Sequence, residues 1–417
     1  MKVLVVGSGG REHTIVWKIK KDNSDCEIYA APGNGGMANI ATCVPIGAME
    51  IDKMIEFAKS EKIDLVMVAP DDPLAAGMVD AMQVAGIRAF GPTKDAAIIE
   101  ASKSFSKELM KKYNIPTAAY DKFENSGDAI KYLDSQTFPV VIKADGLALG
   151  KGVIIAEDYD TAVKSIKEIM DDKIFGDSGN NIIIEEFLTG PEVTVLAFTD
   201  GKSMIPMVSS QDHKRAFDGN KGLNTGGMGT FTPSPVYTKE IADKCMEEIF
   251  LPTMNAMNKE GRTFKGIIYF GLMITNDGPK VIEYNARFGD PETQVILPVL
   301  KSNLLEIFEK TVDEELDTLE IEWDDSAAAC IVMASGGYPS KYATGYEIEG
   351  LDSFFEEDAI VFHAGTKKED GKYYTAGGRV LGVVSKGNTV ADAAKKAYEY
   401  VSKIDFKDKH YRTDIGK

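Results

Sequence analysis

The stretch Val3–His13, VLVVGSGGREH, decides the fold class of this chain. The aliphatic run Val3–Val6 predicts a buried strand, and the glycines after it predict a tight turn into a helix. Similar runs at Glu27–Ala30 and Leu65–Ala69 are each followed by turn residues and a helix-like segment. This rhythm predicts βαβ units around a parallel sheet, so we expect an α/β protein with an N-terminal Rossmann-like domain.

The same turn is also a candidate anion site, because unpaired backbone N–H groups gather at the start of a helix. A dinucleotide fingerprint would need a third glycine where this chain has Glu12, so one phosphate is favoured over a pyrophosphate. A tight turn without any ligand is the alternative. The sequence Pro32–Asn34 follows the second strand at the same sheet edge and supports a site there, whereas a lone His13 is more often structural than catalytic.

The composition limits the classes of partner. At 417 residues the chain is long enough for about three domains. Its 65 acidic and 47 basic residues give a net charge of −18, which repels nucleic acid and anionic membranes, so we expect neither as a partner. The four scattered cysteines form no Cys-x-x-Cys pair, which argues against structural zinc and a disulfide framework. No stretch is long enough to span a membrane and no leader precedes Val3, so a cytoplasmic location is expected.

The rest of the chain reads as further strands and helices. Strands are expected at Pro139–Lys143, Gly152–Ala156, Ile182–Glu185, Glu192–Phe198, Gly266–Thr275, Lys280–Tyr284 and Ala327–Ala334. Long helices are expected at Lys239–Lys259 and near Thr389–Val401. Composition and turn residues place the domain boundaries near 102, 190 and 325.

Two motifs in the middle of the chain suit a nucleotide. Lys143 ends a strand and faces the glycine-containing loop Asp145–Lys151, whose N–H groups can fold over phosphates; the spacing is not that of a Walker loop, and a surface hairpin is an equal alternative. The segment Glu185–Leu188 can offer backbone groups to adenine, and Glu192 can bind ribose hydroxyls. An acidic strand end exposed to solvent would look the same.

The run Glu283–Glu292, EYNARFGDPE, is the most specific feature. Glu283 and Asn285 lie two apart on a strand and therefore point to the same face. A carboxylate beside an amide oxygen suits a Mg²⁺ ion that carries substrate phosphates. Arg287, which we place on that face as well, would hold an anion close to the metal, whereas an exposed polar strand end is the alternative.

At these residues the chain resembles the ATP-grasp superfamily, and within it the phosphoribosylamine–glycine ligases, over essentially its whole length. The markers occur in the family's order: Gly9–His13, Lys143–Ala148, Ser210–Arg215, Asn224–Gly229, Asn285–Glu292, Ala334–Pro339, His363–Thr366 and Gly377–Val380.

The resemblance implies three parts: an N-terminal substrate-binding domain (1–102), an ATP-grasp domain (103–325) with a mobile lid at about 120–190, and a C-terminal domain (326–417). It implies an enzyme that phosphorylates glycine with ATP to glycyl phosphate, which the amine of 5-phosphoribosylamine then attacks. Mg²⁺ or Mn²⁺ is the implied metal cofactor, and the implied assembly state is a monomer. This chemistry needs positioned cations rather than a protein nucleophile.

The resemblance also implies roles for individual residues. Arg287, Lys143 and Asp212 are the implied catalytic residues, and Glu283 and Asn285 the implied metal ligands. The implied ATP-binding residues are Lys103, Lys143, Gly150, Lys151, Gly152, Glu185, Glu186, Phe187, Leu188 and Glu192. The implied substrate-binding residues are Gly9, Gly10, Arg11, Glu12, His13, Asn34, Asp71, Asp212, His213, Lys214, Asp290, Pro291 and Glu292.

The sequence departs from the family pattern at two places. Asp71 stands where relatives commonly carry glutamate, which shortens the acid by one methylene group. The strand Gly266–Thr275 lacks the second metal-binding carboxylate of many ATP-grasp enzymes, so a second Mg²⁺ would depend on water and nucleotide.

Three competing functions are consistent with parts of the sequence. They are an ATP-grasp ligase with another acid or amine, a nicotinamide oxidoreductase built on the N-terminal unit, and a non-catalytic nucleotide-binding regulator. Glu12 argues against the oxidoreductase, and Lys143, Glu283, Asn285 and Arg287 together argue against the regulator.

Overall fold

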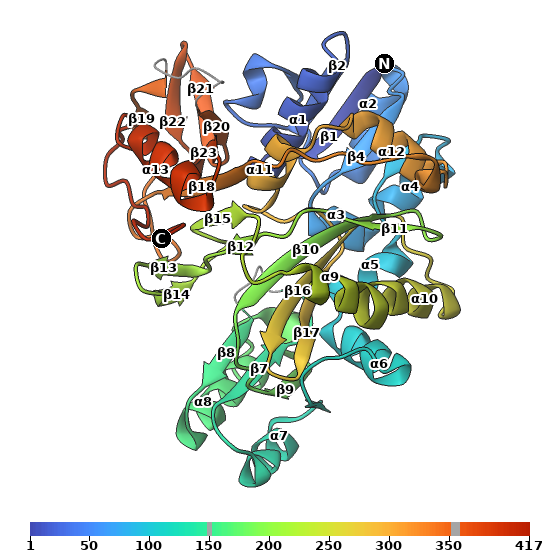
Figure 1. Cartoon of the computed structure of the whole chain (residues 1–417), viewed down its shortest axis with the longest axis vertical. Helices are drawn as coiled ribbons and strands as arrows, with labels where there is room; N and C mark the ends of the chain where they lie inside the picture. Colours follow the sequence, from blue (N-terminus) through green and yellow to red (C-terminus); the bar gives the residue numbers. More distant parts are fainter. Residues whose placement is uncertain (148–151, 352–358) are drawn as a thin grey trace.

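The computed structural model describes residues 1–147, 152–351 and 359–417. Figure 1 shows an elongated molecule in which the N-terminal and C-terminal sheets lie side by side at one end. A central sheet occupies the middle, and a smaller sheet forms the other end. The candidate site residues therefore belong to several different sheets.

The N-terminal sheet has the order β3-β2-β1-β4-β5 and is parallel throughout. Its strands are β1 (Lys2–Gly7), β2 (Glu27–Pro32), β3 (Thr42–Cys43), β4 (Leu65–Val68) and β5 (Ala89–Phe90). The helices between them are α1 (Gly10–Asp22), α2 (Ile51–Ser60), α3 (Asp71–Ala76) and α4 (Met78–Val84), and α5 (Lys94–Ala101) follows the last strand. Strand β1 is buried along nearly its whole length, as expected for a parallel strand covered on both faces.

The small sheet at the opposite end is antiparallel, with the order β6-β9-β7-β8. It consists of β6 (Tyr120–Phe123), β9 (Ile182–Glu186), β7 (Val140–Ala144) and β8 (Val153–Ala156). Helices α7 (Ser126–Tyr132) and α8 (Tyr159–Met170) cover one face and form a separate apolar core with it. Its core is distinct from that of the rest of the molecule, as expected of a unit that can move as a body.

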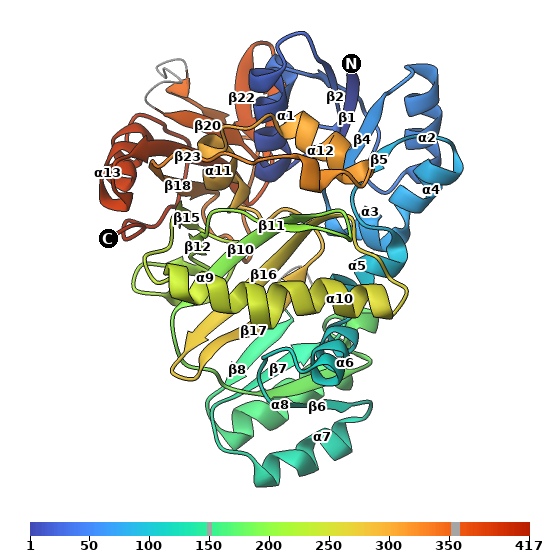
Figure 2. The same cartoon turned by 45° about the vertical axis from the view of Figure 1, so that its right-hand side comes forward.

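The central sheet has the order β11-β10-β16-β17. Its strands are β11 (Met204–Pro206), β10 (Glu192–Thr199), β16 (Gly266–Thr275) and β17 (Gly278–Asn285). One continuous helical rod crosses it, as Figure 2 shows, and consists of α9 (Lys239–Cys245), a π-helical turn (Met246–Phe250) and α10 (Leu251–Lys259). Phe250 of the rod stacks on Phe270 of β16 with ring centres 4.3 Å apart, so this face of the sheet is closed and the other is available for a site.

The C-terminal sheet has the order β12-β15-β18-β23-β20. Its strands are β12 (Gln211–Asp212), β15 (Gly229–Thr232), β18 (Ala327–Ala334), β23 (Arg379–Gly387) and β20 (Ile360–His363), with α13 (Val390–Val401) packed against it. A hairpin of β13 (Arg215–Phe217) and β14 (Lys221–Asn224) projects from its edge, and β19 (Glu347–Ile348), β22 (Lys372–Thr375) and β21 (Thr366–Glu369) form a small sheet. Asp212 thus belongs to an edge strand of this sheet, although it lies far from β18 in sequence.

Shorter elements connect the sheets. They are α6 (Lys103–Tyr113), α11 (Thr293–Ile296), α12 (Leu304–Val312) and the 3₁₀ turns Met37–Asn39, Leu133–Ser135, Gly176–Gly179, Leu297–Val299 and Leu316–Thr318. Asn303 caps α12 by accepting the N–H groups of Leu305 and Glu306, and Ser102 caps α6 by accepting that of Phe105.

The predicted strands are all present, and the structure adds where two of them belong and where a third ends. The strands near 182–185 and 192–198 belong to different sheets, so the segment between them passes from the small sheet to the central sheet. Strand β17 ends at Asn285, and the N–H of Ala286 donates to Glu100 Oε2 at 2.7 Å instead of continuing the ladder. Arg287 therefore lies two residues beyond the strand, but its side chain stays with the other two: Arg287 Nη2 donates to Asn285 Oδ1 at 3.2 Å, and Glu283, Asn285 and Arg287 line one cavity.

Candidate active site

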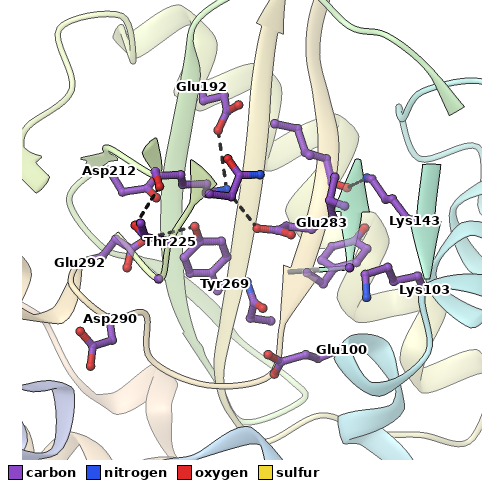
Figure 3. Close-up of a pocket in the computed structure, with 18 of the residues that line it drawn as sticks. Glu100, Lys103, Lys143, Glu192, Asp212, Thr225, Tyr269, Glu283, Asp290 and Glu292 are labelled. Carbon is purple, nitrogen blue, oxygen red and sulfur yellow. Dashed lines mark hydrogen bonds and ion pairs between the residues drawn. The ribbon is translucent and has the colours of Figure 1, made fainter. Parts of the chain in front are cut away.

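A cavity of about 750 Å³ lies between the small and central sheets and reaches towards the N-terminal and C-terminal sheets. It is lined by Arg11, Asp71, Ile99, Glu100, Lys103, Ser106, Lys107, Met110, Lys143, Leu147, Gly152, Val153, Ile155, Glu185, Gly190, Pro191, Glu192, Gln211, Asp212, His213, Lys214, Arg215, Asn220, Asn224, Thr225, Gly226, Tyr269, Ile282, Glu283, Tyr284, Asn285, Arg287, Asp290, Glu292 and Arg379. Figure 3 shows Glu283 in the middle, with Lys103 and Lys143 on one side and Asp212 and Tyr269 on the other.

Most of the site residues expected from the sequence meet in this cavity. Those that line it are Arg11, Asp71, Lys103, Lys143, Gly152, Glu185, Glu192, Asp212, His213, Lys214, Glu283, Asn285, Arg287, Asp290 and Glu292. The lining drawn from the described residues does not include Gly9, Gly10, Glu12, His13, Asn34, Glu186, Phe187, Leu188 or Pro291. Gly150 and Lys151 lie outside the described residues.

Lys143 belongs to a buried charge cluster at the end of β7. Its Nζ lies 3.0 Å from Glu185 Oε2 and donates to Ile282 O at 3.0 Å. Lys107 Nζ lies 3.3 Å from the other oxygen of Glu185, and burial lowers the pKa of Lys107 to about 8. The Glu185 carboxylate thus holds two ammonium groups at the wall of the cavity, where they can form charge-assisted hydrogen bonds with an anion.

Lys103, at the start of α6, faces the loop that follows β7. Its Nζ donates to Gly146 O at 2.9 Å, and Asp145 Oδ1 accepts the N–H of Ser104 at 2.7 Å. Burial lowers the pKa of Lys103, although Glu283 opposes this effect. The loop and the helix therefore present Lys103 to the same space as Lys143.

Glu283 is the carboxylate at the centre of the cavity. Lys214 Nζ lies 3.3 Å from Glu283 Oε1 and 3.7 Å from Glu192 Oε2. Lys214 is the main cause that lowers the pKa of Glu283 to about 2, and Lys143 and Lys103 add to it. Glu283 is therefore ionised at neutral pH and can serve as a hard oxygen ligand.

Arg287 is fixed by several acceptors. Its Nη2 lies 2.8 Å from Glu100 Oε1 and donates to Asn285 Oδ1 at 3.2 Å, while Asp71 Oδ2 lies 4.0 Å away. Burial is the largest single influence and lowers the pKa of Arg287, but Glu100, Asp71 and Glu292 together outweigh it, so the pKa is raised. The buried Nε has no hydrogen-bond partner among the described residues, so this guanidinium keeps one donor for a ligand.

Acidic groups gather at the side of the cavity opposite the lysines. Burial raises the pKa of Asp212 to about 7, with Lys214 opposing the effect and Glu292 adding to it. The hydroxyl of Tyr269 donates to Glu292 Oε1 at 3.0 Å and lies 2.9 Å from Thr194 Oγ1, and Figure 3 shows the Tyr269–Glu292 contact. Asp212 is therefore a group that can exchange a proton near neutral pH.

The turn before α1 differs from a vacant anion site. The N–H of Gly9 donates to Glu12 Oε2 at 2.6 Å, and the N–H of Arg11 donates to Asp290 Oδ2 at 3.3 Å. Carboxylates of this chain thus occupy two donors that a phosphate would use. Only the Arg11 side chain of this turn reaches the cavity lining.

His13 and Asn34 connect the N-terminal and C-terminal sheets. His13 Nδ1 accepts the N–H of His363 at 2.8 Å, and burial lowers the pKa of His13 to about 3. Asn34 Nδ2 donates to Ser8 O at 2.9 Å and to His363 O at 2.8 Å. In this structure both side chains make contacts between domains.

The glycine-containing segment Asn224–Gly229 packs against the residues that follow β17. Arg379 Nη1 donates to Gly226 O at 2.6 Å and to Asp290 O at 2.8 Å. Gly227 has a φ of +113°, and a Cβ there would lie 2.4 Å from Pro291 Cδ, so this position requires glycine.

Several cavity residues were not identified from the sequence. Glu100, Lys107 and Tyr269 were missed, and Arg379 was noted only as part of a marker motif. Lys107 follows Lys103 by one helical turn, and this spacing was a usable signal. Glu100 contacts Arg287 and Tyr269 contacts Glu292, in each case far away in the sequence, so no local pattern marks either residue.

Neither a ready-made metal cluster nor a membrane-spanning helix occurs in residues 1–147, 152–351 and 359–417. No group of three or more His, Cys, Asp or Glu side chains there could hold a metal ion by itself. No helix there is long and apolar enough to cross a membrane.

Comparisons with known proteins place the chain in a family. Models described as phosphoribosylglycinamide synthetase match residues 1–100 (N domain), 101–293 (ATP-grasp domain) and 328–417 (C domain). Phosphoribosylamine–glycine ligase of Clostridium acetobutylicum is 49% identical over 417 residues, covering 100% of both chains. That of Escherichia coli O157:H7 is 46% identical, covering 100% of this chain and 98% of the other.

Solved structures agree with this result. A phosphoribosylamine–glycine ligase from Thermotoga maritima has a TM-score of 0.85 at 34% identity and covers 100% of both chains. The biotin carboxylase domain of 2-oxoglutarate carboxylase from Hydrogenobacter thermophilus has a TM-score of 0.74 at 14% identity, covering 98% of this chain and 91% of that chain, which shows likeness of fold alone. The chain therefore belongs to the phosphoribosylglycinamide synthetase family, the phosphoribosylamine–glycine ligases of the ATP-grasp fold, whose members are ATP-dependent enzymes of purine biosynthesis.

Proposed function

We propose that this chain joins glycine to 5-phosphoribosylamine at the expense of ATP, giving glycinamide ribonucleotide, ADP and phosphate. The observation that carries the proposal is the gathering of Lys103, Lys143, Lys214, Glu283 and Arg287 in one cavity between the two sheets. Phosphoryl transfer depends on positioned cations and on charge stabilisation, and this cavity supplies both. Full-length relatives that bear the ligase name support the choice of substrates.

For ATP, we assign the phosphates to Lys103 and Lys143, with the loop 150–152 closing over them. The base lies against the segment Glu185–Leu188, and Glu192 accepts ribose hydroxyls. The N–H of Glu186 already donates to Ala119 O at 2.9 Å, so adenine recognition at Glu186 would use its carbonyl group. Apolar cavity residues, among them Met110, Ile155 and Ile282, are suited to the faces of the purine ring.

For the metal, we assign Glu283 and Asn285 as the protein ligands of Mg²⁺ or Mn²⁺. The donor set fits this role, since Glu283 is ionised, with a pKa of about 2, and both residues line the cavity. Mg²⁺ commonly takes one or two protein oxygens and completes its shell with phosphates and water. When bound, the ion would neutralise charge on the β- and γ-phosphates.

For the reaction, we propose the following roles for these side chains. Arg287 holds the glycine carboxylate, and one of its oxygens attacks the γ-phosphorus, so that ADP leaves and glycyl phosphate forms. The amine of 5-phosphoribosylamine attacks the acyl carbon, and phosphate departs as the amide forms. Asp212, whose pKa is about 7, accepts the proton that the amine loses.

For the second substrate, we assign the remaining residues around Gly9–His13, Asn34, Asp71, His213 and Asp290–Glu292 to binding of 5-phosphoribosylamine and glycine. The Gly9 and Arg11 N–H groups donate to Glu12 and Asp290, and the Arg11 Nε and Nη1 groups donate to Glu12 Oε1 and Phe288 O, so we assign the phosphate contact to Arg11 Nη2.

For the organisation of the chain, we propose domains at 1–102, 103–325 and 326–417, with 120–190 as the moving lid. The separate core of the small sheet supports this division. We further propose that the protein acts as a monomer in the cytoplasm, where ATP is available.

The test is an assay of ADP release with ATP, glycine and 5-phosphoribosylamine in which each is omitted in turn. We expect release to require all of them and glycinamide ribonucleotide to be the product by mass spectrometry. Release that proceeds equally with another amino acid in place of glycine would contradict the choice of acid.

A further inference from the structure

Arg412 is a buried arginine outside the cavity. Its side chain is among the largest fully buried ones, with an exposed fraction of 1%. Its Nε and Nη2 donate to the two carboxylate oxygens of Asp414 at 2.7 and 2.8 Å. Its Nη1 donates to Arg215 O at 3.2 Å and to Asn220 Oδ1 at 3.0 Å. A buried guanidinium is costly unless its donors are used, so Arg412 holds these partners in place and depends on them in turn.

Two of the partners of Arg412, Arg215 O and Asn220 Oδ1, lie on the β13–β14 hairpin, residues 215–224. Further contacts join the same hairpin to residues 410–414, which we name the bracket segment. Asp414 Oδ2 accepts the N–H of Gly219 at 2.8 Å, Asp218 Oδ1 accepts the N–H of Thr413 at 2.8 Å, and His410 Nε2 lies 2.7 Å from Ala216 O.

The hairpin itself carries part of the cavity wall. Arg215, Asn220 and Asn224 line the cavity, whereas Phe217 and Leu223 are exposed to solvent by 52% and 60%. The turn at Gly219 and Asn220 has left-handed φ angles of +68° and +54°. Because these apolar side chains lie in solvent, they do not anchor the hairpin in a hydrophobic core. The contacts with the bracket segment are suited to fix its position instead.

The hairpin begins at the residue after Lys214. Lys214 Nζ lies 3.3 Å from Glu283 and 3.7 Å from Glu192, the residues assigned to the metal and to ribose. At the other end of the hairpin, the N–H and hydroxyl of Thr225 donate to Lys214 O at 2.7 and 2.8 Å. The carbonyl oxygen that accepts from Arg412 Nη1 belongs to Arg215, the residue next to Lys214, so Lys214 lies between this contact and those of Thr225.

We propose that Arg412 is a positioning residue for the nucleotide site, acting through the hairpin to place Lys214 between Glu283 and Glu192. The bracket segment thereby couples the C-terminal domain to Mg-ATP binding. The proposal rests on the assignment of Glu283 and Glu192 to the nucleotide under the proposed function.

The test is the Arg412→Lys variant, which keeps the charge but cannot reproduce the forked contact to Asp414 together with those to the hairpin. We expect Mg-ATP affinity measured by calorimetry to weaken about tenfold, equivalent to about 1.4 kcal/mol. The KM for Mg-ATP should rise by a similar factor while the KM for glycine changes less than about twofold. Trypsin cleavage after Lys221 of the folded enzyme should become faster.

Two further variants make the test specific. Thr413→Val removes one exposed hydroxyl contact to Asp218 without emptying a buried site, so it serves if Arg412→Lys does not fold, and it should shift the same quantities in the same direction. Lys409→Met is the matched control, because Lys409 contacts Asp405 at 3.1 Å and Ile404 O at 2.7 Å, and it should leave Mg-ATP affinity unchanged.

The outcomes separate this inference from the proposed function. Wild-type protein that binds Mg-ATP but makes no glycinamide ribonucleotide would refute the proposed function alone. Folded Arg412→Lys and Thr413→Val variants with wild-type Mg-ATP affinity and wild-type cleavage after Lys221 would overturn the positioning role. A fall in melting temperature without either change would assign Arg412 to stability only.

Discussion

Replacing Lys143 with methionine removes one ammonium group from the cavity and keeps the length of the side chain. Lys143 Nζ lies 3.0 Å from Glu185 Oε2, and Lys107 Nζ lies 3.3 Å from Glu185 Oε1. Glu185 therefore retains one buried cation partner in the variant. Breaking a buried ion pair completely costs about 3–5 kcal/mol, and the remaining partner should limit the loss of folding stability to about 1–2 kcal/mol.

The effect on catalysis should be larger than the effect on folding. A charge-assisted contact to a transferring phosphoryl group that strengthens in the transition state contributes about 3 kcal/mol, which corresponds to a loss of about a hundredfold in kcat/KM. The expected variant is thus a folded protein with little activity.

The measurement is ADP release under saturating glycine and 5-phosphoribosylamine, with the melting temperature recorded on the same sample. Lys122→Met is the control, since Lys122 lies on β6 and contacts Glu108 at 4.0 Å and Glu124 at 3.8 Å, away from the cavity. A Lys143→Met variant with more than about a third of wild-type activity would refute the proposal that Lys143 stabilises charge in the transition state.

Other predictions concern the metal, the acid, the loops and pH. Glu283→Gln should lower activity steeply, and raised Mg²⁺ should restore part of it, because the lost charge favours a hard divalent ion. Arg287→Lys should not respond to Mg²⁺, since lysine cannot bind an anion bidentately; identical Mg²⁺ titrations of the two variants would reject this division of roles. Limited proteolysis should cleave 224–229 more slowly with Mg-ATP, and equal rates would count against an ordering loop. Burial lowers the pKa of His13 to about 3 and that of His363 to about 4, below the value of 6.5 in the unfolded chain. The two neutral histidines therefore add to the free energy of unfolding in full above pH 6.5, and this stabilisation is lost as the pH falls towards 4. The melting temperature of the wild-type protein should drop over that pH range, and that of the His13→Gln variant should drop less. Parallel plots of melting temperature against pH for the two proteins would argue that the histidines do not cause the loss of stability.

Local sequence patterns predicted the features of the structure that depend on neighbouring residues in the chain. Aliphatic runs such as Val3–Val6 became buried parallel strands, because a strand covered on both faces needs apolar residues at every position. The same-face placement of Glu283 and Asn285 follows from the period of a strand, and both line the cavity. Motif order was enough to identify the family, since eight marker segments occurred in one sequence.

Local patterns mislead where a long-range contact replaces the local rule. Strand β17 ends at Asn285 because Glu100, from α5, takes the N–H of Ala286. The turn at Gly9 appeared suited to an anion, but Glu12 and Asp290 already accept its N–H groups. In both cases a carboxylate supplies the backbone partner, and such a pairing leaves no periodic trace.

By itself, the sequence determined the α/β class, the family and most of the charged groups of the site, because residue type and strand period are local properties. Only the tertiary structure decided which groups control one another. It placed Lys107 beside Glu185, Glu100 beside Arg287, and Arg412 against the hairpin that follows Lys214. Electrostatic coupling depends on distance in space and on burial, and both are set when separate sheets pack together rather than by neighbours along the chain.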